Sequence, residues 1–422
     1  MRVGIDFRAM QVGHQYRGIG EVLRNACRQL DQRLSPHDEV VAFHDAPGPS
    51  VAPLLESLFG PDRTVTEADM PPATGGLRRF GRLRDSLSAE QVGVMVGACD
   101  VLVQFDFLLG VPEGLPTVVV VHDQVPLLLG DRYPEIYWPH YGVARRRGLP
   151  RRMAAERALR RWLYEHNLAN ALRRAAHVVA NSHHTGRTTV AFAQQQGIEG
   201  LDARLTVCQL GCDATSGAET RPNAMERARF EALGLVESPF VFYLGGVDDR
   251  RRIDLLVSAF NHLRAGGLDL KLVLAGDSFA TVASVGVESA RRALMSSSYA
   301  PDIYLLGFVS QAERDWLYRR AGAFVFPSEH EGFGLPVLES LAAGCAVVTF
   351  DNSSLPEVCG PNCELVTADW RSLADGAERL LDRSTEEQAR GAAAGKTWAA
   401  GFTWDTLGLE LAHQLDRLRG GR

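Results

Sequence analysis

The chain has 422 residues, of which 45% are hydrophobic and 23% are charged, an ordinary composition for a soluble globular protein. This length exceeds what one hydrophobic core supports and predicts two domains of roughly 150–200 residues each. The net charge of −6 provides no basic excess, which argues against nucleic acid as a partner.

Short apolar runs typical of buried strands alternate with helical patterns along the chain. The predicted strands are residues 3–7, 40–43, 101–105, 117–121, 177–180 and 206–209, followed by 240–245, 270–275, 303–306, 323–326 and 346–350. A polar stretch at 213–236 separates the two series, and residues 61–90, rich in Pro, Gly and Arg, predict a mobile loop. The alternation predicts an α/β protein with two doubly wound, Rossmann-like parallel sheets.

These patterns also predict the domain boundaries. We expect an N-terminal Rossmann-like domain over residues 1–215, a linker over 216–236 and a C-terminal Rossmann-like domain over 237–402. An amphipathic helix over residues 403–420 would pack back on the first domain. Because ligands of such sheets bind at the carboxyl ends of the strands, two sheets facing each other would form an interdomain cleft.

The cysteines and the apolar segments favour a cytoplasmic location. The seven cysteines lie scattered through apolar segments at Cys27, Cys99, Cys208, Cys212, Cys345, Cys359 and Cys363. Without a matching set of zinc ligands, buried free thiols are favoured over disulfides or a metal, which points to a reducing compartment. Residues 1–6 enter a strand directly, without a signal peptide, and no apolar run approaches the ~18–20 residues of a membrane span.

Three polar motifs follow predicted strands of the first half. Gly18 and Gly20 open a helix and either bring the backbone close to a ligand or make a tight turn. His122 follows the strand at 117–121, where it could hydrogen-bond a hydroxyl or transfer a proton, the alternative being a packing histidine capped by Asp123. For Ser182, capping of the next helix is favoured over contact with a substrate.

The turn after residues 240–245 combines glycines with cations. Gly245 and Gly246 let the backbone approach a ligand, and Arg250 and Arg251 follow at the start of the next helix. Their guanidinium groups could bind a diphosphate bidentately and stabilise its charge as it departs. A solvated helix start with surface arginines is the alternative.

The most informative stretch runs from Glu331 to Glu339, directly after the predicted strand 323–326. Gly334 allows a tight turn, and Pro336 suits the first turn of the helix that follows. Free backbone N–H groups at such a helix start favour a phosphate. Glu339 could accept hydrogen bonds from a ribose and Glu331 from a second polyol, so the stretch predicts a site for a nucleotide joined to a sugar.

Missing motifs and surface arginines bear on cofactors and membranes. No Asp-x-Asp pair is present to hold a metal-bound diphosphate, so we expect neither a metal ion nor a cofactor.

Arginine-rich stretches at residues 77–84 and 145–162 could make peripheral contact with an anionic membrane, although an exposed helical face turned to water is favoured.

Together these motifs resemble the retaining nucleotide-sugar glycosyltransferases of family 4, which have the GT-B fold. The resemblance rests on the Glu-x7-Glu block from Glu331 to Glu339, with Phe-Gly-Leu-Pro inside it, and covers residues 3 to about 404 in the family's order. Supporting matches lie at residues 17–20, 121–123, 180–182, 210–213, 274–276, 306–309 and 356–358.

The resemblance implies a role for each matched residue. The groups acting on the reacting centre would be Glu331 on the donor sugar, Arg250 and Arg251 on the leaving group, and His122 near the sugar and the acceptor. The donor would also contact Gly245 and Gly246. Its diphosphate would bind the amides of Phe333, Gly334 and Leu335, and its ribose would bind Glu339. Phe308 and Val309 would lie beside the base, and Gly18 and Gly20 would lie in a loop over the phosphates.

Two positions depart from the family's usual pattern. The family usually has an arginine where this chain has Gly246, and a lysine where it has Arg251. The charge of the diphosphate would then rest on Arg250, Arg251 and the helix start.

The reaction implied is transfer of a hexose from a nucleotide-diphosphate sugar to an acceptor hydroxyl, with the anomeric configuration kept. Residues 16–20 and 121–128 are similar to mannosyl- and related transferases that build surface polysaccharides, which favours GDP-mannose over UDP-linked sugars. The acceptor would be a glycan, a lipid-linked glycan or a small molecule.

Other functions remain as alternatives. One is a UDP-sugar-dependent transferase of a secondary metabolite, and another is a non-catalytic protein that binds nucleotides or sugars. A dinucleotide oxidoreductase is disfavoured because Gly18-Ile19-Gly20 lacks the third glycine of that motif. A phosphorylase is disfavoured because neither Lys271 nor Lys396 lies in a setting that suits pyridoxal.

Overall fold

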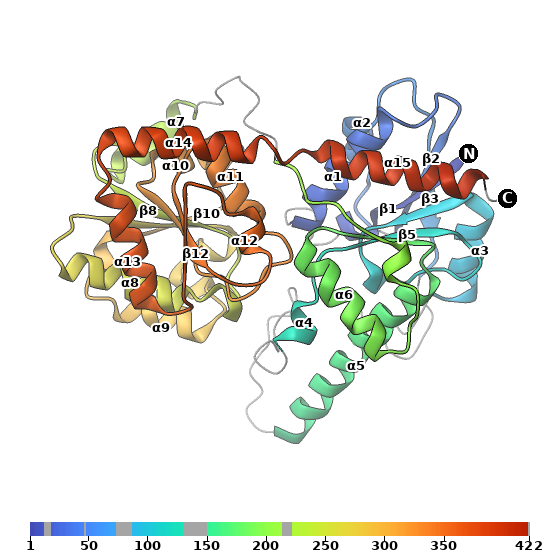
Figure 1. Ribbon diagram of the computed structural model, residues 1–422, viewed down its shortest axis with the longest axis horizontal. Coiled ribbons are helices and arrows are strands. Elements are labelled where there is room, and N and C mark those ends of the chain that lie inside the picture. The colour runs from blue at the N-terminus through green and yellow to red at the C-terminus, as the bar shows by residue number, and fades with distance from the viewer. Residues whose placement is uncertain (12–17, 46–47, 73–86, 130–149, 213–221, 421–422) are drawn as a thin grey trace. The chain divides into compact units, whose positions relative to one another are not determined.

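A computed structural model describes the chain except for residues 12–17, 46–47, 73–86, 130–149, 213–221 and 421–422, and describes residues 150–158, 160 and 420 through their backbone alone (Figure 1). The chain divides into two compact units: unit 1 comprises Met1–Gly211 with Trp404–Arg422, and unit 2 comprises Cys212–Thr403. Each unit contains one parallel sheet with helices on both of its faces (Figure 1).

Unit 1 contains a seven-stranded sheet with the order β3-β2-β1-β4-β5-β6-β7. Its strands are β1 (Arg2–Asp6), β2 (Glu39–Asp45), β3 (Val65–Met70), β4 (Val101–Gln104), β5 (Thr117–Val121), β6 (His177–Ala180) and β7 (Leu205–Val207). Its described helices are α1 (Gly18–Asp31), α2 (Ala52–Leu58), α3 (Ala89–Ala98), α4 (Val125–Leu128), α5 (Pro150–Arg174), α6 (His183–Gln195) and α15 (Trp404–Gly420), with short 3₁₀ helices η1 (Phe7–Gln11), η4 (Phe107–Leu109) and η6 (Asp202–Arg204).

Unit 2 contains a six-stranded sheet with the order β10-β9-β8-β11-β12-β13. Its strands are β8 (Phe240–Leu244), β9 (Lys271–Ala275), β10 (Ile303–Gly307), β11 (Ala323–Phe326), β12 (Val347–Phe350) and β13 (Cys363–Val366). Its described helices are α7 (Ala224–Ala232), α8 (Ile253–Ala265), α9 (Glu288–Ser296), α10 (Gln311–Arg320), α11 (Leu335–Ala343), α12 (Leu355–Val358), α13 (Trp370–Leu381) and α14 (Thr385–Ala399), with 3₁₀ helices η7 (Asp249–Arg251), η8 (Asp277–Phe279), η9 (Val282–Ser284) and η10 (Ala300–Asp302).

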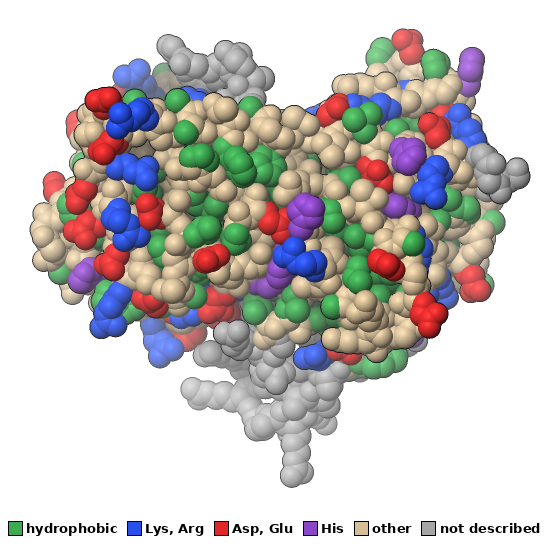
Figure 2. All heavy atoms as spheres, viewed as in Figure 1, with side chains coloured by type: hydrophobic (Ala, Val, Ile, Leu, Met, Phe, Trp, Pro, Cys, Tyr) green, Lys and Arg blue, Asp and Glu red, His purple; other side chains and the backbone are tan. Residues whose placement is uncertain are grey.

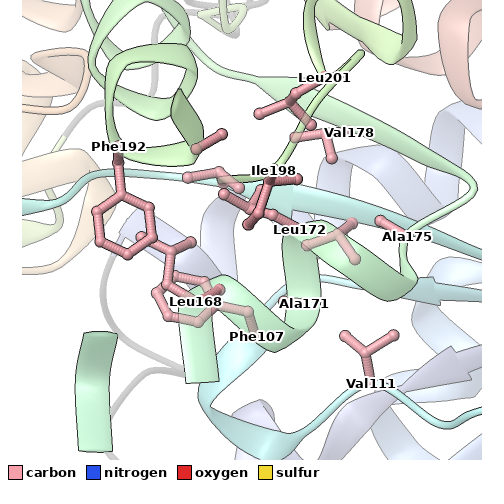
Figure 3. Close-up of a cluster of buried hydrophobic side chains, with 14 of the residues drawn as sticks. Phe107, Val111, Leu168, Ala171, Leu172, Ala175, Val178, Phe192, Ile198 and Leu201 are labelled. Atoms are coloured by element: carbon pink, nitrogen blue, oxygen red, sulfur yellow. The ribbon is translucent and has the colours of Figure 1, made fainter. Parts of the chain in front are cut away.

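Both strand orders are doubly wound, which confirms the predicted α/β fold class. Central strands are buried on both faces and therefore consist of apolar runs: all five residues of β5, from Thr117 to Val121, are buried. Apolar side chains of α5, α6 and β6 meet in one cluster beside this sheet, where Leu168 and Leu172 of α5 lie among Phe192 and Val178 (Figure 3).

Two strands were missed by the sequence analysis, and each lies at the edge of a sheet. The prediction of a mobile loop over 61–90 is wrong for β3, which pairs with β2 from Val65 to Met70. The other missed strand is β13, which pairs with β12. An edge strand has one neighbour and exposes more of its side chains, so its sequence can be polar, and β3 reads Val-Thr-Glu-Ala-Asp-Met.

The expectation of free thiols is wrong for one pair of cysteines. Cys359 and Cys363 form a disulfide across the turn from α12 to β13, with their Cα atoms 5.5 Å apart. The sequence spacing of the two cysteines does not show how the chain turns between them. Whether their Cα atoms come close enough for a disulfide depends on the backbone geometry of that turn. Of the other cysteines, Cys27, Cys99, Cys208 and Cys345 are buried and Cys212 is partly buried.

No described helix is both long and apolar enough to cross a bilayer. On the face shown in Figure 2, the visible acidic and basic side chains are interspersed and do not gather by sign.

Helix α15 follows the last residues of unit 2 and packs along α1 of unit 1 (Figure 1). Its apolar seam consists of Leu407, Leu411 and Leu415, spaced four residues apart and at most 1% exposed. Near its end, Arg419 pairs with Asp38, which also accepts a hydrogen bond from the N-terminal amine at 2.8 Å. These contacts tie the C-terminal helix to the first strand of the chain.

We expect Leu411→Ala to destabilise unit 1 by about 2–5 kcal/mol, because the substitution leaves a cavity in a fully buried seam. The free energy of unfolding is to be measured by urea denaturation. Leu409→Ala is the matched control on the same helix: Leu409 is 55% exposed, so its truncation should change stability by less than about 0.5 kcal/mol. Equal effects of both variants would contradict the packing described for α15.

Candidate functional site

The candidate site of unit 2 lies where the strand order reverses. β8 and β11 are neighbours in the sheet but not in the chain, and ligands of open α/β sheets bind outside the carboxyl ends of such strands. The segment after β8 carries Arg250 and Arg251, and the segment after β11 carries Glu331. The fold thus brings two segments that are 80 residues apart in sequence to one edge of the sheet.

Glycines allow the backbone at this edge to pack closely. Gly245 and Gly276 follow β8 and β9 with φ angles of +154° and +134°. A Cβ on Gly276 would lie 2.2 Å from the carbonyl oxygen of Gly245, and the Gly276 amide donates to the carbonyl of Gly307 at 2.8 Å. Larger residues would separate these strand ends. Gly246, by contrast, has no heavy atom within 4 Å of the position of a Cβ, so the place of the family's usual arginine is open.

Both arginines converge on one oxygen of Glu331. The Nη1 atoms of Arg250 and Arg251 lie 3.1 and 2.8 Å from Glu331 Oε1, and the carboxylate is 9% exposed. Ser328 Oγ donates to the same oxygen at 2.6 Å. The guanidinium of Arg251 also lies 4.7 Å above the centroid of the Phe326 ring at the end of β11. The two cations are therefore held in place by a shared acid and by packing on an aromatic ring.

The backbone reinforces this cluster. Arg250 Nη1 donates to the carbonyl oxygen of His330 at 2.6 Å, and the Glu329 amide donates to the carbonyl oxygen of Arg250 at 2.8 Å. Asp248 is a second acid nearby, 3.4 Å from Arg250 Nε and 4.0 Å from Arg251 Nε. Two guanidinium groups are thus balanced by two carboxylates.

Helix α11 begins beside this cluster. Gly334 precedes it with a φ of +109°, a left-handed conformation that favours glycine, and Gly344 ends it with a φ of +88°. The amides of Phe333, Gly334 and Leu335 donate no hydrogen bond to any described residue. Free donors at a helix start attract an anion, since the helix dipole places partial positive charge there.

Glu339 belongs to a separate cluster, one turn into α11. Its carboxylate accepts hydrogen bonds from Arg314 Nη1 and Tyr318 Oη of α10, both at 3.2 Å. Burial, together with the charge of Glu339, raises the pKa of Tyr318 well above its usual range, so its hydroxyl stays protonated and donates. Phe308 and Val309 lie between β10 and α10. Phe308 exposes 67% of its surface, and Val309 is partly buried. An exposed aromatic ring at a strand end is available for stacking.

The remaining predicted residues belong to unit 1. Gly18 and Gly20 lie within the first turn of α1. His122 follows β5, and its Nε2 lies 2.9 Å from the carbonyl oxygen of Phe105, an atom that only accepts, so we assign the ring proton to Nε2. Burial lowers the pKa of His122 below its usual range, although the charge of Asp123 opposes the shift. The imidazole is therefore neutral near pH 7.

Sequence reasoning found the acids and the cations but missed the residues that hold them. Ser328 and Arg314 each contact one of the two glutamates, and the sequence motifs assigned a role to neither of them. Ser182 caps α6 through a hydrogen bond from the Thr185 amide at 3.0 Å, the structural role that was favoured for it.

Parts of the chain are similar in sequence to known glycosyltransferases. Residues 225–398, most of unit 2, match the family model described as glycosyl transferases group 1. The mannosyltransferase WbdA of Escherichia coli is 24% identical over 85% of this chain, and the match spans 41% of WbdA. A GDP-mannose-dependent phosphatidylinositol monomannoside mannosyltransferase of Mycobacterium tuberculosis is 30% identical over 47% of this chain and 52% of its own length. The chain thus spans about half, or less, of these curated relatives.

Among solved structures, Anabaena HepE in complex with UDP and glucose is similar to this chain, with a TM-score of 0.66 and 18% identity over 98% of this chain and 99% of HepE. WaaG, a glycosyltransferase of lipopolysaccharide biosynthesis, has a TM-score of 0.60 and 13% identity over the full length of both chains. At these identities the likeness shows the fold, and it confirms the predicted GT-B class.

We expect Gly334→Ala to destabilise unit 2 by about 1–3 kcal/mol. Its backbone is left-handed, and the new Cβ would lie 3.1 Å from Leu355 Cδ2. Urea denaturation gives the free energy of unfolding. Gly93→Ala is the control: Gly93 lies in the middle of α3 with open space around it, so alanine should stabilise the protein by about 0.5–1 kcal/mol. A neutral Gly334 variant would show that α11 can start without this conformation.

Proposed function

We propose that this protein is a retaining glycosyltransferase that moves a hexose from a nucleotide-diphosphate sugar to an acceptor hydroxyl. The observation that carries the proposal is the convergence of Arg250 and Arg251 on Glu331, beside the free amides that open α11. The match of residues 225–398 to glycosyl transferases group 1 supports it.

The chemistry of the leaving group explains why cations and amides are needed. Cleavage of the bond between the sugar and the phosphate builds negative charge on the departing nucleoside diphosphate. Preorganised donors aimed at that charge stabilise the transition state, and each contributes about 3 kcal/mol in comparable sites. Arg250, Arg251 and the amides of Phe333, Gly334 and Leu335 would provide them without a metal ion. Glu339 would bind the ribose, and Phe308 with Val309 would border the base.

The surroundings of Glu331 argue against a covalent intermediate. A nucleophilic carboxylate must lie on the face of the sugar opposite to the leaving group, whereas Glu331 contacts Arg250 and Arg251, the two residues that would hold the leaving phosphate. We therefore assign Glu331 to binding hydroxyls of the donor sugar. The acceptor would attack on the face from which the phosphate departs, and the departing phosphate oxygen would take its proton, which keeps the anomeric configuration.

For the donor we favour GDP-mannose, and for the process the assembly of surface polysaccharide or a glycoconjugate. The support is the similarity to two mannosyltransferases, one of them described as GDP-mannose-dependent. A UDP-linked sugar is the second candidate, because HepE was solved with UDP and glucose. We further propose a cytoplasmic enzyme whose acceptor is a glycan, a lipid-linked glycan or a small molecule, with peripheral contact at the inner face of the membrane in the lipid-linked case.

The proposal is tested by donor binding and turnover. We expect GDP-mannose or UDP-glucose to raise the melting temperature in a thermal-shift screen in which ADP-glucose, NAD and free mannose or glucose do not. With the donor that binds, Glu331→Ala and Arg251→Ala should each lower the rate of nucleoside diphosphate release by roughly a hundredfold or more.

Arg379→Ala is the matched control, since Arg379 forms an exposed pair with Glu364 in the same unit and should leave the rate unchanged. Wild-type rates in the Glu331 and Arg251 variants, or stabilisation by NAD alone, would refute the proposed function.

The protonation of His122 predicts how turnover declines at acidic pH. Its pKa is lowered, so the neutral ring, with Nδ1 free to accept a hydrogen bond from a sugar hydroxyl, persists from about pH 8 to below pH 6.5. Turnover should therefore decline only as the pH falls through this lowered pKa, which a profile from about pH 5 to 8 records. In His122→Gln the overall rate should be lower and this decline should disappear; an unchanged acid limb would assign it to another group.

A further inference from the structure

Two residues other than glycine have a left-handed backbone in the described part of the chain, and both border the turn that carries Glu331. Arg252 has a φ of 40° and Ser353 a φ of 50°. This conformation is unfavourable for any residue with a Cβ atom and persists only where its surroundings hold it. Glycine would adopt it without strain, so the backbone alone does not explain an arginine and a serine at these positions.

Ser353 lies in the loop between β12 and α12 and binds the Glu331 turn. Its Oγ accepts a hydrogen bond from the Glu331 amide at 2.9 Å and donates to Asn352 Oδ1 at 2.8 Å. Asn352 Nδ2 donates to the carbonyl oxygen of Ser328 at 3.1 Å, and Ser328 Oγ donates to Glu331 Oε1 at 2.6 Å. These bonds form a closed ring that fixes both the backbone and the carboxylate of Glu331.

The adjacent Ser354 strengthens the same contact. It is fully buried, and its Oγ lies 2.9 Å from the carbonyl oxygens of both Glu331 and Phe333. The loop after β12 therefore holds the turn from Glu331 to the start of α11 through hydrogen bonds of its side chains.

Arg252 binds the same turn from the segment after β8. Its Nη1 donates to Glu329 Oε1 at 2.6 Å, while Nε and Nη2 donate to Asp254 Oδ1 and Oδ2 at 3.1 and 2.9 Å. The Glu329 amide in turn donates to the carbonyl oxygen of Arg250. Arg252 thus joins the segment that carries the two phosphate-binding arginines to the segment that carries the sugar-binding acid.

We propose that Ser353 and Arg252 are positioning residues, which hold Glu331 at the point where Arg250 and Arg251 meet. The inference rests on the proposed function and deepens it, because it names the residues that act through Glu331. Neither side chain needs to touch the donor. Both residues act by fixing geometry. Three groups share the Oε1 atom of Glu331, and a displacement of that atom by about 1 Å can lower the rate by two orders of magnitude.

The test uses Ser353→Gly, which removes the hydroxyl and relieves the strained backbone at once. We expect the melting temperature to stay equal or rise, because glycine tolerates the left-handed conformation. We expect kcat for nucleoside diphosphate release from GDP-mannose or UDP-glucose to fall roughly tenfold or more, with a smaller change in the KM of the donor. If Ser353 had only a structural role, the variant would keep the wild-type kcat, whatever its melting temperature.

Two further variants make the result decisive. Ser353→Asn tolerates the same backbone and retains an oxygen acceptor, so it should recover part of the lost rate. In a Glu331→Ala background, Ser353→Gly should cause no further loss, since a residue that acts through Glu331 has nothing left to position. A full additional loss in that background would overturn the inference.

Arg252→Asn tests the second residue in the same assay, with Arg227→Gln as its control. Arg227 forms an exposed pair with Glu231 on α7 and should not affect kcat, whereas Arg252→Asn should lower it roughly tenfold. Failure of the wild-type protein to release nucleoside diphosphate from either donor would refute the proposed function itself. Normal wild-type turnover with unaffected Ser353 and Arg252 variants would refute only the positioning role.

Discussion

The convergence of two guanidinium groups on one carboxylate oxygen is the interaction on which the candidate site depends. Arg250 and Arg251 are neighbours in sequence, and like charges so close repel each other unless an acid lies between them. Glu331 supplies that acid from the segment after β11 and, because it is almost buried, does so with little screening by water. The pairing therefore determines the conformation of both segments at once.

The doubly wound sheet makes this pairing feasible. In a sequential sheet, segments that follow β8 and β11 would be separated by other strands, whereas here the two strands are adjacent. Glycine at Gly245 and Gly276 lets the neighbouring strand ends approach, and Gly334 turns the chain into α11 so that its free amides face the same edge. The course of the backbone thus brings the cations, the acid and the amide donors together at one edge of the sheet.

The sequence predicted the strands in the middle of each sheet because burial on both faces demands apolar runs, as in β5 and β11. It failed at β3 and β13, where one edge is open and polar residues are tolerated. It identified Glu331 and the two arginines separately, but not their pairing, since register between distant segments is not encoded locally. Ser353 escaped notice because its signal is a backbone angle, which no residue pattern records.

Charge balance links the proposed roles of these groups. Without a donor, Glu331 and Asp248 together neutralise Arg250 and Arg251, so the cations are positioned but not in excess. A diphosphate would compete with Glu331 for the guanidinium groups, aided by the amides at the start of α11. Each ion pair that the phosphate takes over would free capacity on the carboxylate, which could then accept a hydrogen bond from a sugar hydroxyl. In the proposed function, binding of the phosphate and binding of the sugar would therefore be coupled through one oxygen atom, and a free nucleoside diphosphate, which lacks the sugar, would leave that freed capacity unused.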